Sequence, residues 1–460
     1  MKKRMLPVIM LAMFFSVATL SIAGEEPTKA ELLKELKELK SRVAALENAL
    51  TQVKEKEDKQ PLTKSMEVDI EKRVEKHVLG KIEDDIKNKA AINSLGLKLG
   101  IAATMIVQGG IDANRVSDNK DDVTAGSYQV DIQFEKEFQD YGYGFAQIEA
   151  GDGVGVMDSL EVFSNVDNNN DDTNNNVELT KFWYEQLLFD KQISLAAGKW
   201  DPTDVVDTNL LAGDDSRQFL SEIFNNAPTF DRPSKAPGIW ARVRPKDLQW
   251  LELQAQVFTG DGEWDNMADH LEVTPEVTFK PKFGDGLIGN YRVYGWLRNT
   301  NYIKWSDPTD TSENRYGLGV SIDQQVTDVL GVFGRYGWAD PDLYDPEVTS
   351  SSGANFSIEH TWSAGLAVSG KLWGRENDHL GLACGMVMPS DEYKKYGGVG
   401  LEADDEGHAE LYYSWYVNRY FAFSPDLQFV WNPFGNDYIV DGERRDQTIT
   451  VIGCRGHLDF

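Results

Sequence analysis

Apolar and polar residues alternate with a period of two through most of the chain, from about Leu97 to Phe460. Side chains that are neighbours on a strand point to opposite faces of the sheet, so such a segment is apolar on one face and polar on the other. About sixteen segments show the pattern, and they begin near Leu97, Ser127, Gly142, Val177, Gln192, Gly238, Leu248, Leu271, Gly289, Arg315, Val329, Thr361, His379, Gly407, Tyr420 and Gln447. We therefore predict an all-β architecture over residues 95–460.

The segments are roughly nine to twelve residues long, which is the length that a tilted strand needs to cross a membrane. In lipid every backbone N–H and C=O must be paired within the protein, so a sheet can span only as a closed barrel. We predict a transmembrane antiparallel β-barrel of about 16 strands, apolar outside and polar inside. An even number of strands lets both ends of the barrel domain lie on the periplasmic side.

The connections between the segments alternate between short and long, as they do in outer-membrane barrels, where short turns face the periplasm and long loops face outward. The clearest short connections are 245–247, 323–327 and 418–419. The clearest long connections are 151–176, 201–237, 339–360 and 389–406.

A different period precedes the barrel. Leucines and valines lie alternately four and three residues apart at Leu32, Leu36, Leu39, Val43, Leu46, Leu50 and Val53. This heptad spacing predicts a periplasmic α-helical coiled coil over 29–60, followed after Pro61 by a helical linker over 61–94. The coil is interpreted as a spacer or stalk that could form a homo-oligomer, or as a tether to the cell wall or to a periplasmic partner helix.

Residues 1–23 read as a secretory signal peptide. Three basic residues precede an apolar run and then small residues near the expected cleavage site. No later run of about 18 apolar residues occurs, which argues against a helical membrane protein. Together with the strand pattern, this places the protein in the outer membrane of a Gram-negative type of envelope, in contact with its lipid.

Composition adds little beyond this. Apolar residues make up 41% of the chain, and the mean hydropathy of −0.43 suits alternating strands better than helices in lipid. The net charge is −29 and would become −32 without the signal peptide, whose three charges are positive. Such acidity argues against a nucleic-acid partner.

Two features could carry chemistry but do not require it. Cys384 and Cys454 have the parity of lipid-facing positions, and we interpret them as small apolar side chains rather than as a disulfide. The segment 165–176 is rich in Asn and Asp, which favours a solvated loop and leaves calcium as an alternative. We predict no metal centre and no cofactor.

Alternation also assigns the inward faces of three strands. It points Trp240, Arg242 and Arg244 inward from one strand, Trp250, Glu252, Gln254 and Gln256 from the next, and Arg292, Tyr294, Trp296 and Arg298 from a third. A sugar offers apolar C–H faces that stack on Trp or Tyr, and hydroxyls that bond with Arg, Glu or Gln. The alternative is a general porin whose lumen is held open by Arg and Glu pairs.

The connection 201–237 is long and polar, and we predict that it folds into the barrel and narrows it. Paired carboxylates could suggest a glycosidase, but nothing in the sequence fixes an acid and base at the separation that this chemistry needs. No nucleophile motif such as G-x-S-x-G is present. We predict no catalytic residues and no enzyme activity.

Five short stretches make the chain resemble the carbohydrate-selective porin family of the OprB type, over roughly 97–460. They are Gly198–Asp204 with Gln218–Leu220 and Asn225–Asn226; Gly334–Trp338; Gly374–Gly381; Glu410–Tyr413 with Ser424–Gln428 and Asn432–Pro433; and the final strand to Phe460. The resemblance implies a sixteen-stranded outer-membrane porin through which small neutral sugars diffuse passively. It implies roles for Lys199, Asp201 and Asp204 at a constriction loop, and for Arg335, Glu410 and Gln428 on the lumen side.

Two departures keep other functions open. A heptad stalk is not usual in the family, so the protein could instead tether the envelope and carry an incidental pore. The acidity could make the channel general and weakly cation-selective rather than selective for sugars.

Overall fold

The computed structural model describes residues 96–115, 122–169, 176–284, 286–397, 403–437, 439–440, 443–444 and 448–460. The chain divides into two compact units, 1–95 and 96–460, and the description concerns the second. The predicted signal peptide, coiled coil and helical linker lie outside the described residues.

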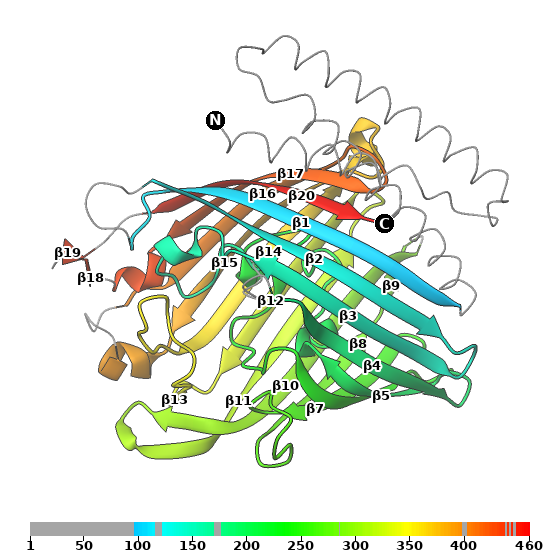
Figure 1. The fold of residues 1–460 in the computed structure, drawn as a ribbon, viewed down its shortest axis with the longest axis horizontal. Helices are drawn as coiled ribbons and strands as arrows, with labels where there is room; N and C mark the ends of the chain where they lie inside the picture. The colour runs from blue at the N-terminus through cyan, green and yellow to red at the C-terminus, as the bar shows by residue number, and fades with distance from the viewer. Residues whose placement is uncertain are drawn as a thin grey trace, which may run out of the picture. The chain divides into compact units, whose positions relative to one another are not determined.

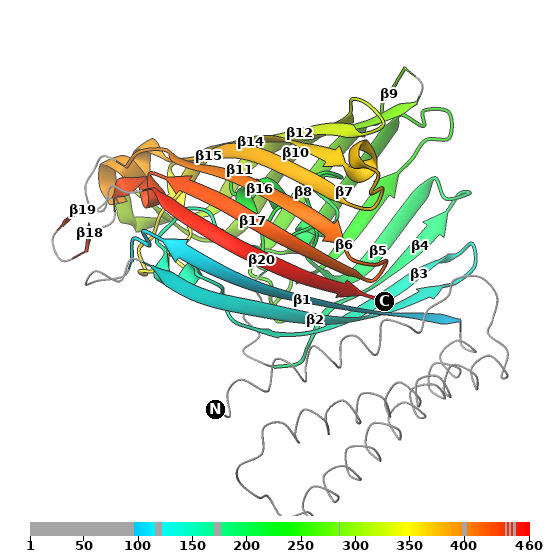
Figure 2. The ribbon, with the colours of Figure 1, turned by 90° about the horizontal axis from the view of Figure 1, so that it is seen from above.

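Sixteen long strands form the second unit (Figures 1 and 2). They are β1 (Leu97–Ile111), β2 (Val123–Glu137), β3 (Gly142–Asp152), β4 (Glu178–Leu188), β5 (Ile193–Trp200), β6 (Ala236–Val243), β7 (Leu251–Thr259), β8 (Leu271–Phe279), β10 (Leu287–Lys304), β11 (Asp307–Gln325), β12 (Leu330–Ala339), β14 (Ile358–Ser369), β15 (His379–Pro389), β16 (Glu406–Tyr416), β17 (Phe421–Trp431) and β20 (Ile449–Asp459). Each corresponds to one predicted segment.

The remaining elements are short. In the described parts of the connections lie four two-residue strands: β9 (Lys282–Phe283), β13 (Leu343–Tyr344), β18 (Ile439–Val440) and β19 (Glu443–Arg444). The helical turns are η2 (Met157–Ser159), η3 (Pro202–Asp204), α4 (Glu222–Asn225), η4 (Gly370–Trp373), η5 (Tyr393–Gly397) and η6 (Pro433–Asn436). Within the described part of the chain, no helix is long and apolar enough to cross a membrane.

The sheet closes on itself. Each long strand pairs antiparallel with the next along the chain, and β20 pairs antiparallel with β1, for example at Thr104 and His457. Figure 2 shows these first and last strands side by side. Closure pairs both edges of every long strand, which confirms the prediction of a sixteen-stranded antiparallel barrel.

The largest difference from the predicted strand starts is at β11, which begins at Asp307 rather than near Arg315. The reason is the β10–β11 hairpin, whose two strands are 18 and 19 residues long and are joined by two residues. The polar residues at its tip mask the alternation, although Asp307, Thr311 and Ser312 still pair with β10.

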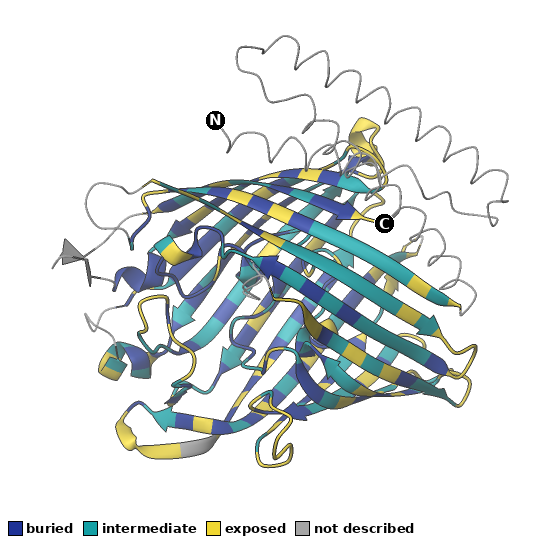
Figure 3. Cartoon of the chain, in the orientation of Figure 1, coloured by how far each residue is buried: buried dark blue, intermediate teal, exposed yellow. Residues whose placement is uncertain are grey.

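Burial alternates along the strands as the sequence predicts (Figure 3). On β7 Glu252, Gln254 and Gln256 are buried inside the barrel, while Leu253 is 40% exposed on the outside. On the outer face Val293 lies in register with Val277 and Val320 of the neighbouring strands. The outer surface is therefore a continuous apolar band of the kind that contacts lipid.

The two ends of the barrel differ in their connections. At one end the strands are joined by 138–141, 189–192, 244–250, 280–286, 326–329, 370–378 and 417–420. At the other end they are joined by 112–122, 153–177, 201–235, 260–270, 305–306, 340–357, 390–405 and 432–448. We call these the short-turn end and the long-loop end, and their asymmetry matches the predicted alternation.

The interior is filled unevenly. Phe163, Phe219 and Phe224 from two long loops pack against Phe333 of β12 and Tyr412 of β16 in one buried apolar cluster. A second buried cluster joins loop residues 154–166 to residues of β17 and β20. Loops therefore fill the interior beside β12 to β20.

The lipid-facing assignment makes a testable prediction. Val293→Arg would place a charge in the apolar band, and we expect the free energy of unfolding in lipid vesicles to fall by about 2–4 kcal/mol. Urea titration followed by tryptophan fluorescence measures this. Asp247→Arg, in the connection 244–250, is the control and should change the free energy by less than about 0.5 kcal/mol. Equal effects of the two substitutions would contradict the assigned outer face.

Candidate functional site

The connection 201–235 folds into the barrel, and we call it the constriction loop. It leaves β5 through η3, where the Asp201 carboxylate accepts hydrogen bonds from the Thr203 N–H (2.9 Å) and hydroxyl (2.6 Å). The start of the loop is fixed to β4 by an ion pair of 2.7 Å between Asp204 and Lys181. Its end is fixed to β3 by an ion pair between Lys235 and Glu149.

The middle of the constriction loop is held by Arg335 of β12. The guanidinium lies 3.3 Å from the Asp207 carboxylate and donates to the carbonyls of Phe224 (2.5 Å) and Asp207 (3.1 Å). Asp207 is fully buried and also accepts from the Ala227 N–H at 2.8 Å. Burial raises the pKa of Asp207 although Arg335 opposes this. Arg335 thus joins two distant turns of the loop to the wall.

A second anchor gathers around Asp231 of the same loop. Its carboxylate pairs with Arg298 of β10 and Arg315 of β11, and it accepts from the Tyr302 hydroxyl at 2.9 Å. Burial alone would raise the pKa of Asp231, but the two guanidinium groups hold it below its ordinary value. The ionised carboxylate is therefore the form that the folded protein stabilises.

Two carboxylates of β16 hold the loops from another part of the barrel wall. Glu410 accepts from the N–H groups of Leu220 (2.6 Å) and Ser221 (2.9 Å). Glu406 accepts from the N–H groups of Phe163 (2.9 Å) and Phe434 (2.7 Å). These bonds satisfy loop N–H groups that are shut off from water.

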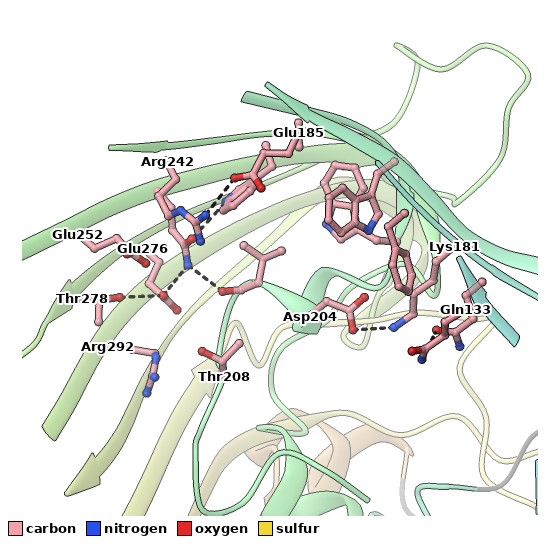
Figure 4. A pocket seen from close by; sticks show the side chains of 18 of the residues that line it. Gln133, Lys181, Glu185, Asp204, Thr208, Arg242, Glu252, Glu276, Thr278 and Arg292 are labelled. Carbon is pink, nitrogen blue, oxygen red and sulfur yellow. Dashed lines mark hydrogen bonds and ion pairs between the residues drawn. The ribbon is translucent and has the colours of Figure 1, made fainter. Parts of the chain in front are cut away.

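A cavity of about 530 Å³ lies between the constriction loop and the wall formed by β2 to β10 (Figure 4). Its lining combines aromatic rings, amides and charged groups. The residues are Gln133, Phe145, Gln147, Lys181, Trp183, Glu185, Ala196, Trp200, Asp204, Val205, Thr208, Trp240, Arg242, Glu252, Gln254, Glu276, Thr278, Lys280 and Arg292.

Each cation in this lining is paired with a carboxylate. Lys181 pairs with Asp204 at 2.7 Å, Arg242 with Glu185 at 3.0 Å, Lys280 with Glu252 at 2.8 Å, and Arg292 with Asp323 at 2.6 Å. Because the opposite charges are in contact, these pairs produce little net electric field in the cavity. Their polar atoms still give the wall many hydrogen-bonding groups.

Eleven of the fourteen predicted site residues fall into two groups. Asp204, Trp240, Arg242, Glu252 and Arg292 line the cavity. The second group faces inward but contacts protein: Asp201, Trp296, Arg298, Arg335, Glu410 and Gln428 lie against the loops that fill the interior. Parity gives the direction of a side chain but not whether the space that it enters is open.

Three further predicted residues lie elsewhere. Arg244 follows β6 and pairs with Glu252 at 2.5 Å, at the short-turn end. Trp250 belongs to the turn before β7, is 49% exposed and stacks on Phe279, which is itself 40% exposed. Its predicted inward position is wrong because residues in a turn do not follow strand parity.

Lys199 is also placed differently from its prediction. It lies on β5 in register with Phe182 and Pro237, on the outward parity, and its ammonium contacts the Leu179 carbonyl at 3.5 Å. The constriction loop begins after Lys199. Lys199 therefore does not point into the lumen, although it belongs to a stretch that resembles the family.

Several cavity residues were not singled out from sequence. Phe145, Lys181, Trp183, Glu185 and Trp200 come from β3, β4 and β5. The three aromatic residues at 182–184 hide the alternation of β4, because ring size and polarity do not distinguish its faces. The charged residues Lys181 and Glu185, four apart on that strand, carry the parity signal that could have assigned the face.

The family comparison covers most of the barrel. A model described as "Carbohydrate-selective porin, OprB family" matches residues 145–460. The chain belongs to this family. No curated protein sequence matches it.

A solved structure shares the fold of this OprB-family chain. The high-pH structure of OprB from Pseudomonas putida has a TM-score of 0.64 and 17% identity, and the match covers 81% of this chain and 96% of that one. Its low-pH structure gives a TM-score of 0.49 and 15% identity over 82% and 97%. The outer-membrane channel DcaP of Acinetobacter baumannii gives 0.48 and 12% over 79% and 97%.

The second anchor predicts the effect of a single substitution. Asp231→Asn removes the carboxylate that Arg298 and Arg315 share, and breaking a buried pair in this way costs about 3–5 kcal/mol. We expect the constriction loop to loosen and single-channel current to become noisier and larger. The exposed Asp265→Asn is the control, and a current in Asp231→Asn as quiet as in this control would count against the anchor.

The lowered pKa of Asp231 predicts a pH dependence. A carboxylate with a depressed folded pKa stabilises the fold above its unfolded pKa, about 3.9, and loses this effect as the pH falls toward the folded pKa. The difference in unfolding free energy between wild type and Asp231→Asn should therefore be constant from pH 7 to 5 and shrink below about pH 4. A difference that shrinks near neutral pH would show that another group controls it.

Proposed function

We propose that the protein lets small neutral sugars diffuse passively across the outer membrane through the cavity beside β2 to β10. Membership in the carbohydrate-selective porin family makes it an outer-membrane porin. The observation that carries the finer proposal is the composition of the cavity wall, where aromatic rings alternate with ion pairs that are internally neutralised.

This wall suits a solute that is polar at its edges and apolar on its faces. Hydroxyl groups can accept from Arg242 and donate to Glu185, while C–H faces of a sugar ring can lie on an indole. A free anion gains less, because each cation of the lining that it would approach already has a carboxylate in contact.

The long-loop end would face outward and the short-turn end the periplasm, as in other outer-membrane barrels. In this orientation the predicted coiled coil of 29–60 would lie in the periplasm. It could form a homo-oligomer, or bind the cell wall or a periplasmic partner. The solute is proposed to pass without chemical change.

A weakly cation-selective general channel is the second candidate. Asp131 of β2 has the inward parity of Gln133 and accepts from the amides of Gln129 (3.2 Å) and Gln147 (3.0 Å). Its hydrogen-bond donors are amides rather than cations, so its carboxylate would attract cations into the lumen.

Liposome swelling separates the two candidates. In liposomes that carry the protein, isotonic glucose should enter faster than a neutral acyclic polyol of equal size, and the rate in protein-free liposomes gives the background. Equal rates in glucose and in the polyol, with cation-selective current in bilayers, would favour the general channel.

The wall ion pairs predict a shift in ion selectivity. Arg242→Gln removes the partner of Glu185 and leaves a carboxylate beside the cavity. The reversal potential in a KCl gradient should move toward cation selectivity, by several millivolts in a tenfold gradient. The matched control is Arg419→Gln, in the turn 417–420, which should leave the potential unchanged. An unshifted potential in Arg242→Gln would mean that current does not pass this wall.

A further inference from the structure

One lysine of the barrel wall faces the membrane instead of the lumen. Lys199 lies in register with Phe182 of β4, and both neighbours of Phe182, Lys181 and Trp183, line the cavity. Phe182 and Lys199 therefore share the outer face. Among the described residues, Lys199 is the only lysine or arginine that alternation places on the outer face in the long-loop half of the sixteen long strands. A charge on this face is costly at the middle of the bilayer and is tolerated near its surface.

The position of Lys199 suits a contact at the membrane surface. It is the last residue but one of β5, next to the long-loop end. Its ammonium reaches the carbonyl of Leu179 at 3.5 Å, at a bulge where the pairing of β4 with β3 shifts. Among the described residues no carboxylate pairs with it, because Asp204 and Glu149 of the same wall pair with cations on the inner side. An ammonium has three donors, so Lys199 can still bind an anion that comes from the membrane side.

A loop covers the wall beside this lysine. The connection 260–270 follows β7, yet its Trp264 stacks on Phe182 of β4, with 5.8 Å between ring centroids and 6° between planes. Because Phe182 faces outward, the stack lies on the membrane side of the barrel. Trp264 is 51% exposed and Phe182 is 37% exposed, so both rings are open to a ligand. A tryptophan in this setting offers an apolar ring and an N–H donor at the level of lipid headgroups.

The surroundings of Lys199 are acidic rather than basic. Asp261, Glu263 and Asp265 of the covering loop are exposed, and the whole chain carries a net charge of −29. These carboxylates repel an anion, so a general attraction of the protein surface for anions does not operate here. Attraction at this place must come from the lysine itself, which makes its contribution separable by substitution.

We propose that Lys199, together with the stack of Phe182 and Trp264, binds the phosphorylated headgroup of an outer-leaflet glycolipid. The ammonium would donate to phosphate oxygens in charge-assisted hydrogen bonds, and the indole would cover the C–H face of the headgroup sugar. The site rests on the proposed orientation, in which the long-loop end faces outward. It does not rest on the passage of sugars through the lumen.

The experiment measures binding of lipid A, a phosphorylated glucosamine glycolipid, to the full-length protein in detergent by native mass spectrometry. The buffer contains EDTA, so that a divalent cation cannot bridge the phosphate to the acidic loop. We expect the wild type to bind lipid A and to lose most of this binding when the phosphates of the lipid are removed. Lys199→Gln should raise the dissociation constant about tenfold, and Trp264→Leu about threefold.

Two further variants make the result specific. Lys199→Arg keeps the charge and should bind lipid A within about twofold of the wild type, since guanidinium groups also bind phosphate. Lys246→Gln removes an exposed lysine from the connection 244–250 at the short-turn end, and should leave the dissociation constant unchanged. Single-channel conductance of each variant shows that the barrel has folded.

Several outcomes would overturn the site. Equal binding by the wild type and Lys199→Gln would show that the lysine only reaches water. Equal binding of the phosphorylated and dephosphorylated lipids would show that phosphate is not recognised. The same loss in Lys246→Gln as in Lys199→Gln would reduce the effect to overall charge. Displacement of lipid A by an excess of inorganic phosphate would show that the lysine binds a free anion rather than a lipid headgroup.

Discussion

A long loop folded inside a barrel must find partners for its backbone away from bulk water, and the structure depends on how the wall supplies them. Glu406 and Glu410 accept loop N–H groups, and Arg335 donates to loop carbonyls. An unpaired buried backbone group costs roughly 1–3 kcal/mol, so these charged wall residues stabilise the loops by satisfying their backbone groups. Through them the barrel sets the path of the constriction loop and, with it, the position of the cavity.

The sequence was sufficient for the barrel and for part of the site. Alternation predicts the strands because a barrel wall with lipid outside and polar groups inside requires apolar and polar residues in turn. It also correctly assigned Trp240, Arg242 and Arg292 to the inner face. It could not distinguish Arg292, which borders the cavity, from Arg335, which lies under a loop, because both have inward parity. That distinction depends on contacts between residues more than a hundred positions apart.

The errors have local causes. Trp250 precedes the regular part of its strand, and Lys199 matches a family motif on a position whose parity is outward. Trp183 was missed because the adjacent Phe182 and Tyr184 make both faces of β4 aromatic. The net charge of −29 was equally uninformative about the lumen, where the cations of the cavity lining are matched by carboxylates.

Because loops fill part of the interior, the width of the passage is not fixed by the number of strands, although the outer circumference is. The outer circumference is fixed by sixteen strands and by the lipid that surrounds them. The cross-section left for solutes is fixed by an inner lining of loops, attached to the wall at a few charged positions such as Arg335 and Glu410. Changes at those positions can reshape the passage while the membrane-facing surface stays constant, so related barrels of one size can admit solutes of very different dimensions.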